Sequence, residues 1–298
     1  MSIFLKKIGI LIISTFVIAN LLSYISLWTL RQSSFYKPSF LVNAVSETNF
    51  DYIVLGASTG LTTLDTQVID SLSGKKGINL AIDDTSISSQ YLMLEHFLAL
   101  GKTTKICVIA PSFTSFDTQI QSLNANDYRF LPYVDRSYVS DYFQSFSSVN
   151  AKLLSGSKYF PMLGVSYYNS EVFYPSLLSV FQPNRHNRFD TNGNYTYPVQ
   201  DLMSGHIKNR QSIKLNFKNG ALKKIQELCD RNNIELICYI SPIKNIEIVS
   251  NTSDYEIINH SDVLIKTDYF FDNVHVNSLG RQVISERFAN DLSSYFKD

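Results

Sequence analysis

The sequence predicts an α/β protein with a doubly wound parallel sheet and one N-terminal transmembrane helix. Short apolar runs that end in small or polar residues predict strands, and segments with helical apolar spacing lie between them. Strands that alternate with helices form parallel sheets, in which ligands bind outside the carboxyl ends of the strands. An uncharged apolar run near the N-terminus predicts the membrane helix. The runs are 8–30 for the membrane helix, 51–58, 75–82, 105–112 and 234–242 for strands, and 86–100, 213–232 and 279–296 for helices.

The N-terminal run Ile8–Leu30 has 23 residues and no charge, which is long enough to cross a hydrocarbon core of about 30 Å. Lys6 and Lys7 precede it, so the positive-inside rule predicts a cytoplasmic N-terminus and a main domain in the periplasm or outside the cell. A cleaved signal peptide and a core helix are the alternatives. No small-residue cleavage site follows Leu30, which favours an uncleaved single-pass anchor.

Composition and net charge argue against some classes of function. Across 298 residues, 26 Lys and Arg balance 26 Asp and Glu, so there is no basic stripe to predict a nucleic-acid partner. The length suits one substantial α/β domain with additions. Cys107, Cys229 and Cys238 lack metal-ligand spacing, so we expect no metal site and interpret them as small buried hydrophobes. Three free cysteines favour a reducing compartment, which conflicts with export, and the apolar run outweighs them.

Domain boundaries follow from these elements. Residues 1–30 are predicted to form a cytoplasmic stub and anchor, 31–50 a juxtamembrane linker, and 51–298 the main domain. Within it, 117–205 lose clear periodicity and are interpreted as an insertion that caps the crevice. Val263–Ile265 predict a further weak strand, and Asn277 or Ser278 is placed to cap the last helix.

Ser58 is the candidate nucleophile. It follows an apolar strand and stands among small residues, where a side chain can be exposed on a sharp turn. Acyl-ester chemistry also needs a base within reach of that hydroxyl and a group that orients the base. Asp272 and His275 have the spacing for this, because the carboxylate can accept one imidazole N–H and leave the other nitrogen facing the hydroxyl. Taken singly, a Gly-Ser turn and a capping Asp are the commoner explanations; the pair favours catalysis.

These motifs together resemble blocks of the SGNH (GDSL) hydrolases. GASTGLTTLD resembles the first block, with Ser58 at the nucleophile position, and DNVHVNSLG resembles the fifth, with Asp272 and His275 as the dyad. GINLAIDDTSI resembles the second block, which supplies an oxyanion N–H. The resemblance covers about 51–115 and 212–296, and it implies a three-layer, flavodoxin-like fold with an inserted cap.

The resemblance also implies which residues hold the oxyanion. The candidates are the backbone N–H groups of Ser58 and Asp84, with Ser112 or Thr114 in place of a third donor. Asp84 stands where the second block has glycine. Ser112, Phe113 and Thr114 stand where the third block has Gly-x-Asn-Asp.

Anchored envelope members of this superfamily are the most similar in layout, such as the alginate-acetylation proteins and the protein that helps D-alanylate teichoic acid. The resemblance implies serine-dependent ester hydrolysis or O-acetyl transfer on a cell-envelope or exported polysaccharide, beside a membrane-bound acyltransferase and without a cofactor. Aromatic side chains of the insertion are candidates for a sugar-stacking surface: Tyr167, Tyr168, Phe173, Tyr174, Tyr195 and Tyr197. Two alternatives stay open: a non-catalytic envelope protein that binds glycan or the acyltransferase, and a secreted lipase.

Overall fold

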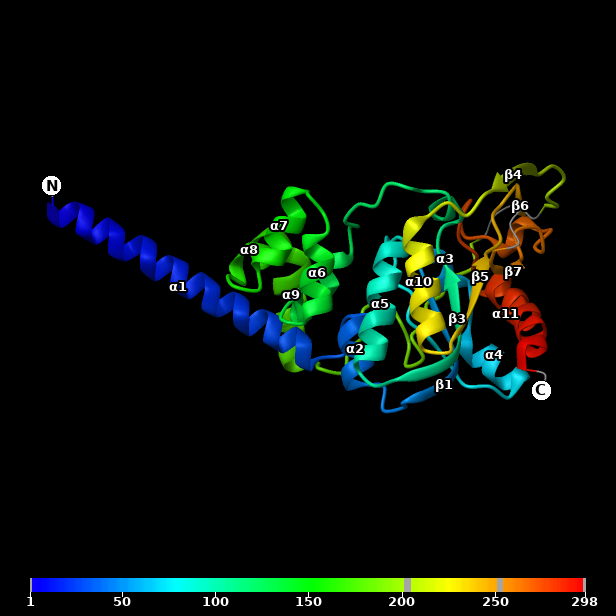
Figure 1. Ribbon diagram of the computed structural model, residues 1–298, viewed down its shortest axis with the longest axis horizontal. Coiled ribbons are helices and arrows are strands. Elements are labelled where there is room, and N and C mark those ends of the chain that lie inside the picture. Colours follow the sequence, from blue (N-terminus) through cyan, green and yellow to red (C-terminus); the bar gives the residue numbers. More distant parts are fainter. Residues whose placement is uncertain (1, 201–204, 251–253, 297–298) are drawn as a thin grey trace. The chain divides into compact units, whose positions relative to one another are not determined.

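The computed structural model describes residues 2–200, 205–250 and 254–296 of a mixed α/β chain. It forms two compact units, each built from two separate segments of the chain (Figure 1). Unit 1 comprises Met1–Ser46 and Asp127–Asn187, and unit 2 comprises Glu47–Asn126 and Arg188–Asp298.

Unit 2 is built on a five-stranded sheet in the order β2-β1-β3-β5-β7, in which all neighbouring strands are parallel. Counted within this sheet alone, the order is 2-1-3-4-5, one of the common doubly wound orders, and the winding direction reverses between β1 and β3. Ligands of such sheets bind outside the strand ends that flank this reversal. The strands are β1 (Asn49–Gly56), β2 (Gly77–Asn79), β3 (Thr103–Ala110), β5 (Glu235–Ile240) and β7 (Glu256–Asn259).

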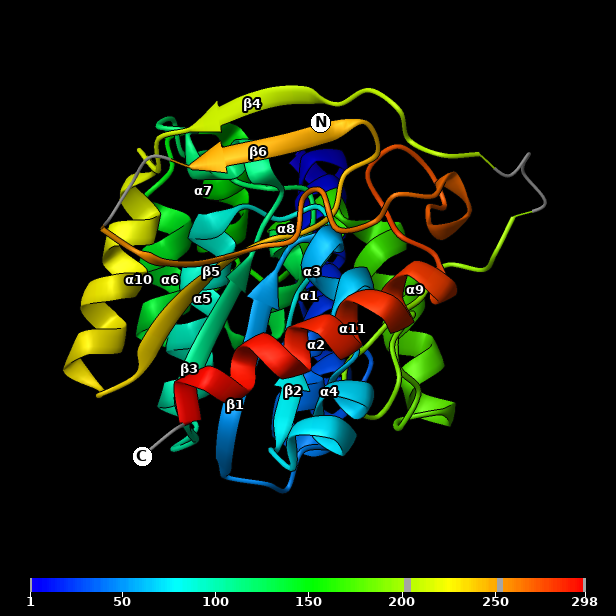
Figure 2. The ribbon, with the colours of Figure 1, turned by 90° about the vertical axis from the view of Figure 1, so that its right-hand side faces the viewer.

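Helices cover both faces of this sheet (Figure 2). In β1, Tyr52 and Val54 pack into one cluster with α4 and α11, while Ile53 and Leu55 point to the opposite face, because successive side chains of a strand alternate. All four side chains are fully buried, which explains why the run reads as continuously apolar. The helices are α4 (Thr66–Ser73) and α11 (Ser278–Leu292) on one face, and α5 (Ile87–Ala99) and α10 (Gly220–Arg231) on the other.

The remaining elements of unit 2 are short. They are α3 (Ser58–Thr63), the 3-10 helices η1 (Phe113–Phe116), η3 (Thr267–Tyr269) and η4 (Ser293–Phe296), and a second sheet of two parallel strands, β4 (Gln211–Leu215) and β6 (Ile246–Ser250).

The predicted parallel sheet is confirmed, and so are its strands near 51–58, 75–82, 105–112 and 234–242. The last helix is confirmed as well, and its cap is Asn277 rather than Ser278: the Asn277 side chain accepts hydrogen bonds from the N–H groups of Leu279 and Gly280. These elements could be predicted because each is either a strand with a continuous apolar run or a helix with a capping residue.

Two predicted elements are wrong. The helix expected over 213–232 begins only at Gly220, because Gln211–Leu215 pair with β6 as a strand and Asn219 caps the helix after them. Pairing with a strand distant in sequence overrides the local helical spacing. Val263–Ile265 form no strand; the outer strand is β7, and Leu264 enters the core from a loop instead.

Unit 1 is helical, and its first helix contains the predicted membrane run. This helix, α1, is long and apolar enough to cross a membrane, and it extends past Leu30 to Gln32. The segment interpreted as a linker contains α2, with Phe40 and Leu41 fully buried. The helices are α1 (Ser2–Gln32), α2 (Lys37–Asn43), the 3-10 helix η2 (Asp127–Tyr133), α6 (Ser137–Gln144), α7 (Val149–Gly156), α8 (Met162–Tyr167) and α9 (Asn169–Phe181).

The segment 117–205, interpreted as one insertion, is divided between the two units: 127–187 belong to unit 1, and the flanking residues belong to unit 2. Its helices give no clear apolar period in the sequence, because most have eight residues or fewer and each contains Ser, Asn or Tyr. In unit 2, the N–H of Tyr195 donates to the carbonyl of Leu61 in α3, and the Asn194 side chain bonds to Thr66 at the start of α4.

The three cysteines are free thiols, and all are buried, as predicted. They lie between the sheet and α10. A hydrogen bond with Cys229 and burial together raise the pKa of the Cys107 thiol, and burial raises that of Cys238, so both stay protonated and unreactive.

Gly56 allows the closest approach of β1 and β3, and its replacement tests that contact. A Cβ atom at this position would lie 2.3 Å from the carbonyl oxygen of Ala110. We expect Gly56→Ala to lower the free energy of unfolding by about 1–3 kcal/mol, because the strands must separate. Gly220→Ala is the control, since its nearest neighbouring atom is 3.9 Å away. Urea unfolding of both variants measures the difference, and equal stabilities would contradict the close contact.

Candidate active site

Three side chains from the two ends of unit 2 form one hydrogen-bonded chain. The Nε2 atom of His275 lies 2.8 Å from the Oγ of Ser58, and its Nδ1 atom lies 2.8 Å from Oδ2 of Asp272. With Nδ1 protonated toward the carboxylate, Nε2 is an acceptor for the Ser58 hydroxyl proton. The structure therefore brings together the three residues that the sequence motifs singled out.

Ser58 is the first residue of α3, directly after β1. The first N–H groups of a helix have no acceptor within it, so those of Ser58 and Thr59 are available to a ligand. Asn79 holds this helix in place: its Nδ2 donates to the carbonyls of Gly60 and Leu64, and its Oδ1 accepts from the N–H of Ala81. Asn79 is fully buried and thereby ties β2 to the helix that carries the serine.

Asp272 shapes the loop as well as orienting the imidazole. Its Oδ1 accepts the backbone N–H groups of Val274 and His275, both at 2.7 Å, and its Oδ2 faces His275 Nδ1. Partial burial raises the pKa of Asp272, but the hydrogen bonds from His275 and from these two N–H groups outweigh that and hold the pKa below its usual value. The carboxylate is consequently ionised at neutral pH, the state needed to stabilise an imidazolium.

Asn277 fixes the other end of this loop. Its Nδ2 donates to the carbonyl of Asp268 at 2.6 Å, while its Oδ1 caps α11. The buried side chain of Asn277 therefore joins the backbone before the loop to the helix after it. His275 itself retains 18% of its side-chain exposure, so the imidazole can be reached from solvent.

Tyr197 forms an aromatic wall beside the histidine. Its ring stacks on Phe271 at 4.2 Å and 8° between planes, and lies 5.3 Å from the ring of His275. Burial raises the pKa of the Tyr197 hydroxyl, which keeps it protonated. Its backbone carbonyl accepts the N–H of Ser278, so the start of α11 positions it.

The six aromatic residues of the expected sugar-stacking surface are divided between the two units. Tyr195 and Tyr197 lie in unit 2, and Tyr197 is close to His275. The other four lie in unit 1. Sequence reasoning missed Phe271, whose position directly before Asp272 was the available signal.

The expected oxyanion residues follow the carboxyl ends of three adjacent strands: Ser58 follows β1, Asp84 follows β2, and Ser112 and Thr114 follow β3. Asp84 is exposed and has a φ of 51°, the left-handed conformation that glycine adopts most easily. The hydroxyls of Ser112 and Thr114 lie 3.2 Å apart and bond to each other. Within the described ranges, no hydrogen bond joins Asp84, Ser112 or Thr114 to the Ser58 side chain.

Across residues 2–200, 205–250 and 254–296, no group of three or more His, Cys, Asp or Glu side chains is placed to hold a metal ion. His260 is a buried structural histidine: its Nε2 pairs with Asp291 at 2.8 Å and its Nδ1 faces the Tyr239 hydroxyl. Desolvation lowers the pKa of His260, although Asp291 opposes this.

No protein-family model matches this chain, and no curated protein is significantly similar to it.

Asn277 offers a test of how the site loop is held. Asn277→Ala removes both the helix cap and the donor to the Asp268 carbonyl. We expect a loss of about 1 kcal/mol for the cap and about 0.5–1.5 kcal/mol for the lost hydrogen bond to the Asp268 carbonyl. Asn277→Ser keeps a capping oxygen and should lie between the wild type and Asn277→Ala in thermal unfolding. An alanine variant as stable as the wild type would show that Asn277 does not hold the loop.

Proposed function

We propose that this chain is an SGNH-like enzyme of acyl esters in which Ser58 is the nucleophile. The observation that carries the proposal is the hydrogen-bonded chain from Ser58 Oγ through His275 to Asp272. Two further features support it. The strand order is that of flavodoxin-like sheets, and the serine and the dyad lie after the first strand and before the last α-helix of the unit, as in the SGNH blocks.

The reaction follows from these positions. Ser58 Oγ attacks the ester carbonyl carbon while its proton passes to His275 Nε2, and the carbonyl oxygen becomes an oxyanion. Collapse of this intermediate breaks the ester C–O bond, and His275 returns the proton to the leaving alkoxide. A water or an acceptor hydroxyl then attacks the acyl-serine and gives its proton to His275. The bond between the acyl carbon and Ser58 Oγ breaks, and His275 returns the proton to Oγ. Water yields hydrolysis, and a sugar hydroxyl yields acyl transfer.

Three groups are proposed to hold the oxyanion. The N–H of Ser58, at the start of α3, is one donor, and the N–H of Asp84 is the candidate second donor. The left-handed backbone of Asp84 fits a position where the SGNH second block has glycine. The third donor would be Ser112 or Thr114, whose hydroxyls are bonded to each other and would have to turn.

This last feature favours a second candidate function, a non-catalytic protein of the same fold that binds glycan or a membrane-bound acyltransferase. The substrate class proposed for either function is an acylated polysaccharide of the cell envelope or an exported one. The flat pair of Tyr197 and Phe271 beside His275 supports a carbohydrate ligand, because sugar rings pack on aromatic faces. The helix α1 would anchor the chain, with Lys6 and Lys7 on the cytoplasmic side.

Ser58→Ala tests the nucleophile. We expect the full-length wild type to turn over p-nitrophenyl acetate and to gain the mass of a fluorophosphonate adduct on Ser58. The alanine variant should lose both, with turnover falling by roughly 10⁴-fold or more. Ser71→Ala, which removes an exposed hydroxyl from α4 in the same unit, is the control and should behave like the wild type. A wild-type serine inert to the probe would favour the binding function.

Asp272→Asn tests the orientation of the imidazole. The amide oxygen would keep the two backbone N–H groups of Val274 and His275, which leaves the NH2 group facing His275 Nδ1. Because that group donates, His275 would carry its proton on Nε2 and point it at Ser58. A loss of about 10⁴-fold in kcat with little change in KM is expected. Unfolding in urea reports whether the loop survives the substitution. Turnover within tenfold of the wild type would mean that Asp272 does not orient His275.

A further inference from the structure

Unit 1 exposes many large apolar side chains along α9, at the end of α8 and on the loop before α8. The stretch 159–181 contains a single charged residue, Glu171. Its exposed large apolar side chains are Tyr159, Phe160, Tyr167, Phe173, Tyr174, Leu177, Val180 and Phe181. Such a surface on a soluble protein marks a site of interaction with another protein or with a membrane.

The opposite face of α9 includes small residues, and α9 packs against α1. The buried residues are Val172, Pro175, Ser176 and Ser179 of α9, and Ser23, Ser26, Leu27 and Leu30 of α1. Small residues that let two helix backbones approach closely are typical of helix packing in membranes. The bulky side chains of α9 thus point away from the protein, the reverse of an amphipathic helix that packs its large apolar residues into a core.

The loop before α8 contacts α1 well inside its apolar run. The rings of Phe16 and Phe160 are 5.5 Å apart, and Oδ1 of Asn20 accepts the N–H of Met162. At about 1.5 Å per residue, Asn20 lies about 15 Å before Leu30, the end of the uncharged run. If α1 crosses a bilayer, these contacts lie near the middle of its hydrocarbon core of about 30 Å, so the tip of this loop reaches the inner limit of the leaflet that holds the second half of α1.

The helix α9 runs across the end of α1 and not along it. The Glu171 carbonyl accepts a hydrogen bond from Tyr36, and the Pro183 carbonyl accepts one from the N–H of Ser34, so both ends of α9 are held just beyond α1. Its 13 residues span only about 20 Å, too short to cross a bilayer. This length and direction suit a helix that lies in the plane of the interface.

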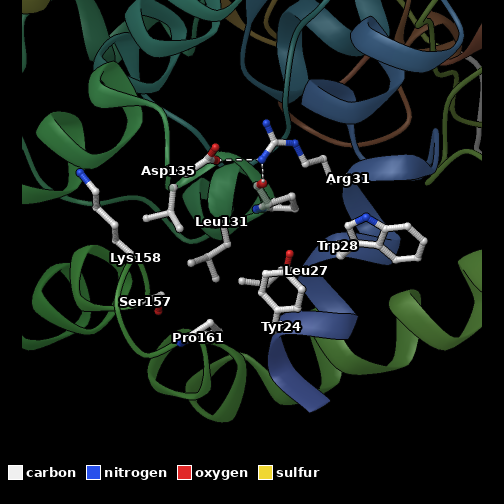
Figure 3. A pocket seen from close by; sticks show the side chains of 11 residues that line it. Tyr24, Leu27, Trp28, Arg31, Leu131, Asp135, Ser157, Lys158 and Pro161 are labelled. Atoms are coloured by element: carbon white, nitrogen blue, oxygen red, sulfur yellow. Dashed lines mark hydrogen bonds and ion pairs between the residues drawn. The ribbon is translucent and has the colours of Figure 1, made fainter. Parts of the chain in front are cut away.

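The side chains around the cavity between α1 and η2 change from apolar to charged toward the end of α1. The cavity has a volume of about 310 Å³. Figure 3 shows the charged ends of Arg31, Asp135 and Lys158 on one side of it, and Tyr24 and Pro161 on the other. Arg31 is neutralised by Asp135 at 2.9 Å. Charges toward the end of α1 and apolar groups toward its middle match a membrane interface, where long cationic side chains reach for the headgroups.

We propose that α9 and the loop 159–161 are embedded in the lipid leaflet from which α1 emerges, so that unit 1 is a membrane-interface module and not a free domain on a tether. The partner is the phospholipid bilayer itself. The proposal rests on the anchoring role proposed for α1, and it does not depend on the chemistry at Ser58.

Tryptophan fluorescence in lipid vesicles tests this placement with the full chain. The sequence has one tryptophan, Trp28, so Trp28→Phe gives a background without the fluorophore. Single tryptophans are then placed at Phe181 of α9, at Ile13 of α1 and at Leu72 of α4, which are 83%, 65% and 58% exposed. Each variant is reconstituted in phosphatidylcholine vesicles whose acyl chains carry bromine, either near the headgroup or near the chain end.

We expect F181W to be quenched most strongly by the shallow bromines, I13W, which lies about 7.5 Å inside the uncharged run, by both kinds of bromine, and L72W by neither. F181W quenched no more than L72W would overturn the proposal, and I13W quenched in the same series would show that the anchor nevertheless stands. An unquenched I13W would instead refute the anchoring role of α1. Labelling of Ser58 by the fluorophosphonate is read separately, so failure of the enzyme proposal remains distinguishable.

Discussion

The close pairing of β1 with β3 is the constraint on which the site depends. A Cβ atom at Gly56 or at Gly60 would lie within 3 Å of the Ala110 carbonyl oxygen, so the end of β1 and the start of α3 can pack directly on β3 only because both residues lack one. The chain must therefore turn sharply at Ser58. Because the strands are parallel, the same edge also receives the residues after β2 and β3, which is why Asp84 and Ser112 lie nearby in the fold.

His275 lies 217 residues after Ser58 in the sequence. A second contact, between the elements that follow these two residues, helps to hold them together. The helix α11, which begins directly after the histidine loop, packs against α4, which follows the serine. Arg281 pairs with Asp65 at 2.7 Å in a largely buried position, and Ser285 accepts the N–H of Asp65. Asp65 thus ties the element after the nucleophile to the element after the base, so the two move as one body.

Much of unit 2 could be predicted because its strands are buried on both faces and its helices carry caps. The missed pair β4 and β6 could not, since most of its side chains are not buried and each strand depends on a partner about 35 positions away. The motifs that contain Ser58, Asp272 and His275 could be recognised, because each is a short segment with a characteristic spacing of residues. The aromatic wall formed by Tyr197 and Phe271 could not be recognised, because the two stacked residues lie far apart in the sequence. A related reason applies to α8 and α9 of unit 1, because they pack against α1, more than 100 residues earlier.

Several polar side chains of α1 and α9 bond within their own helix, and this bears on the solvent around these helices. The hydroxyls of Ser26, Thr29 and Ser176 donate to carbonyls of the turn before them. A hydroxyl that is bonded in this way needs no water molecule as its acceptor. Hydroxyls bonded within the helix, together with bulky exposed apolar side chains, are what a lipid environment favours, and the same surface in water would be costly to leave uncovered.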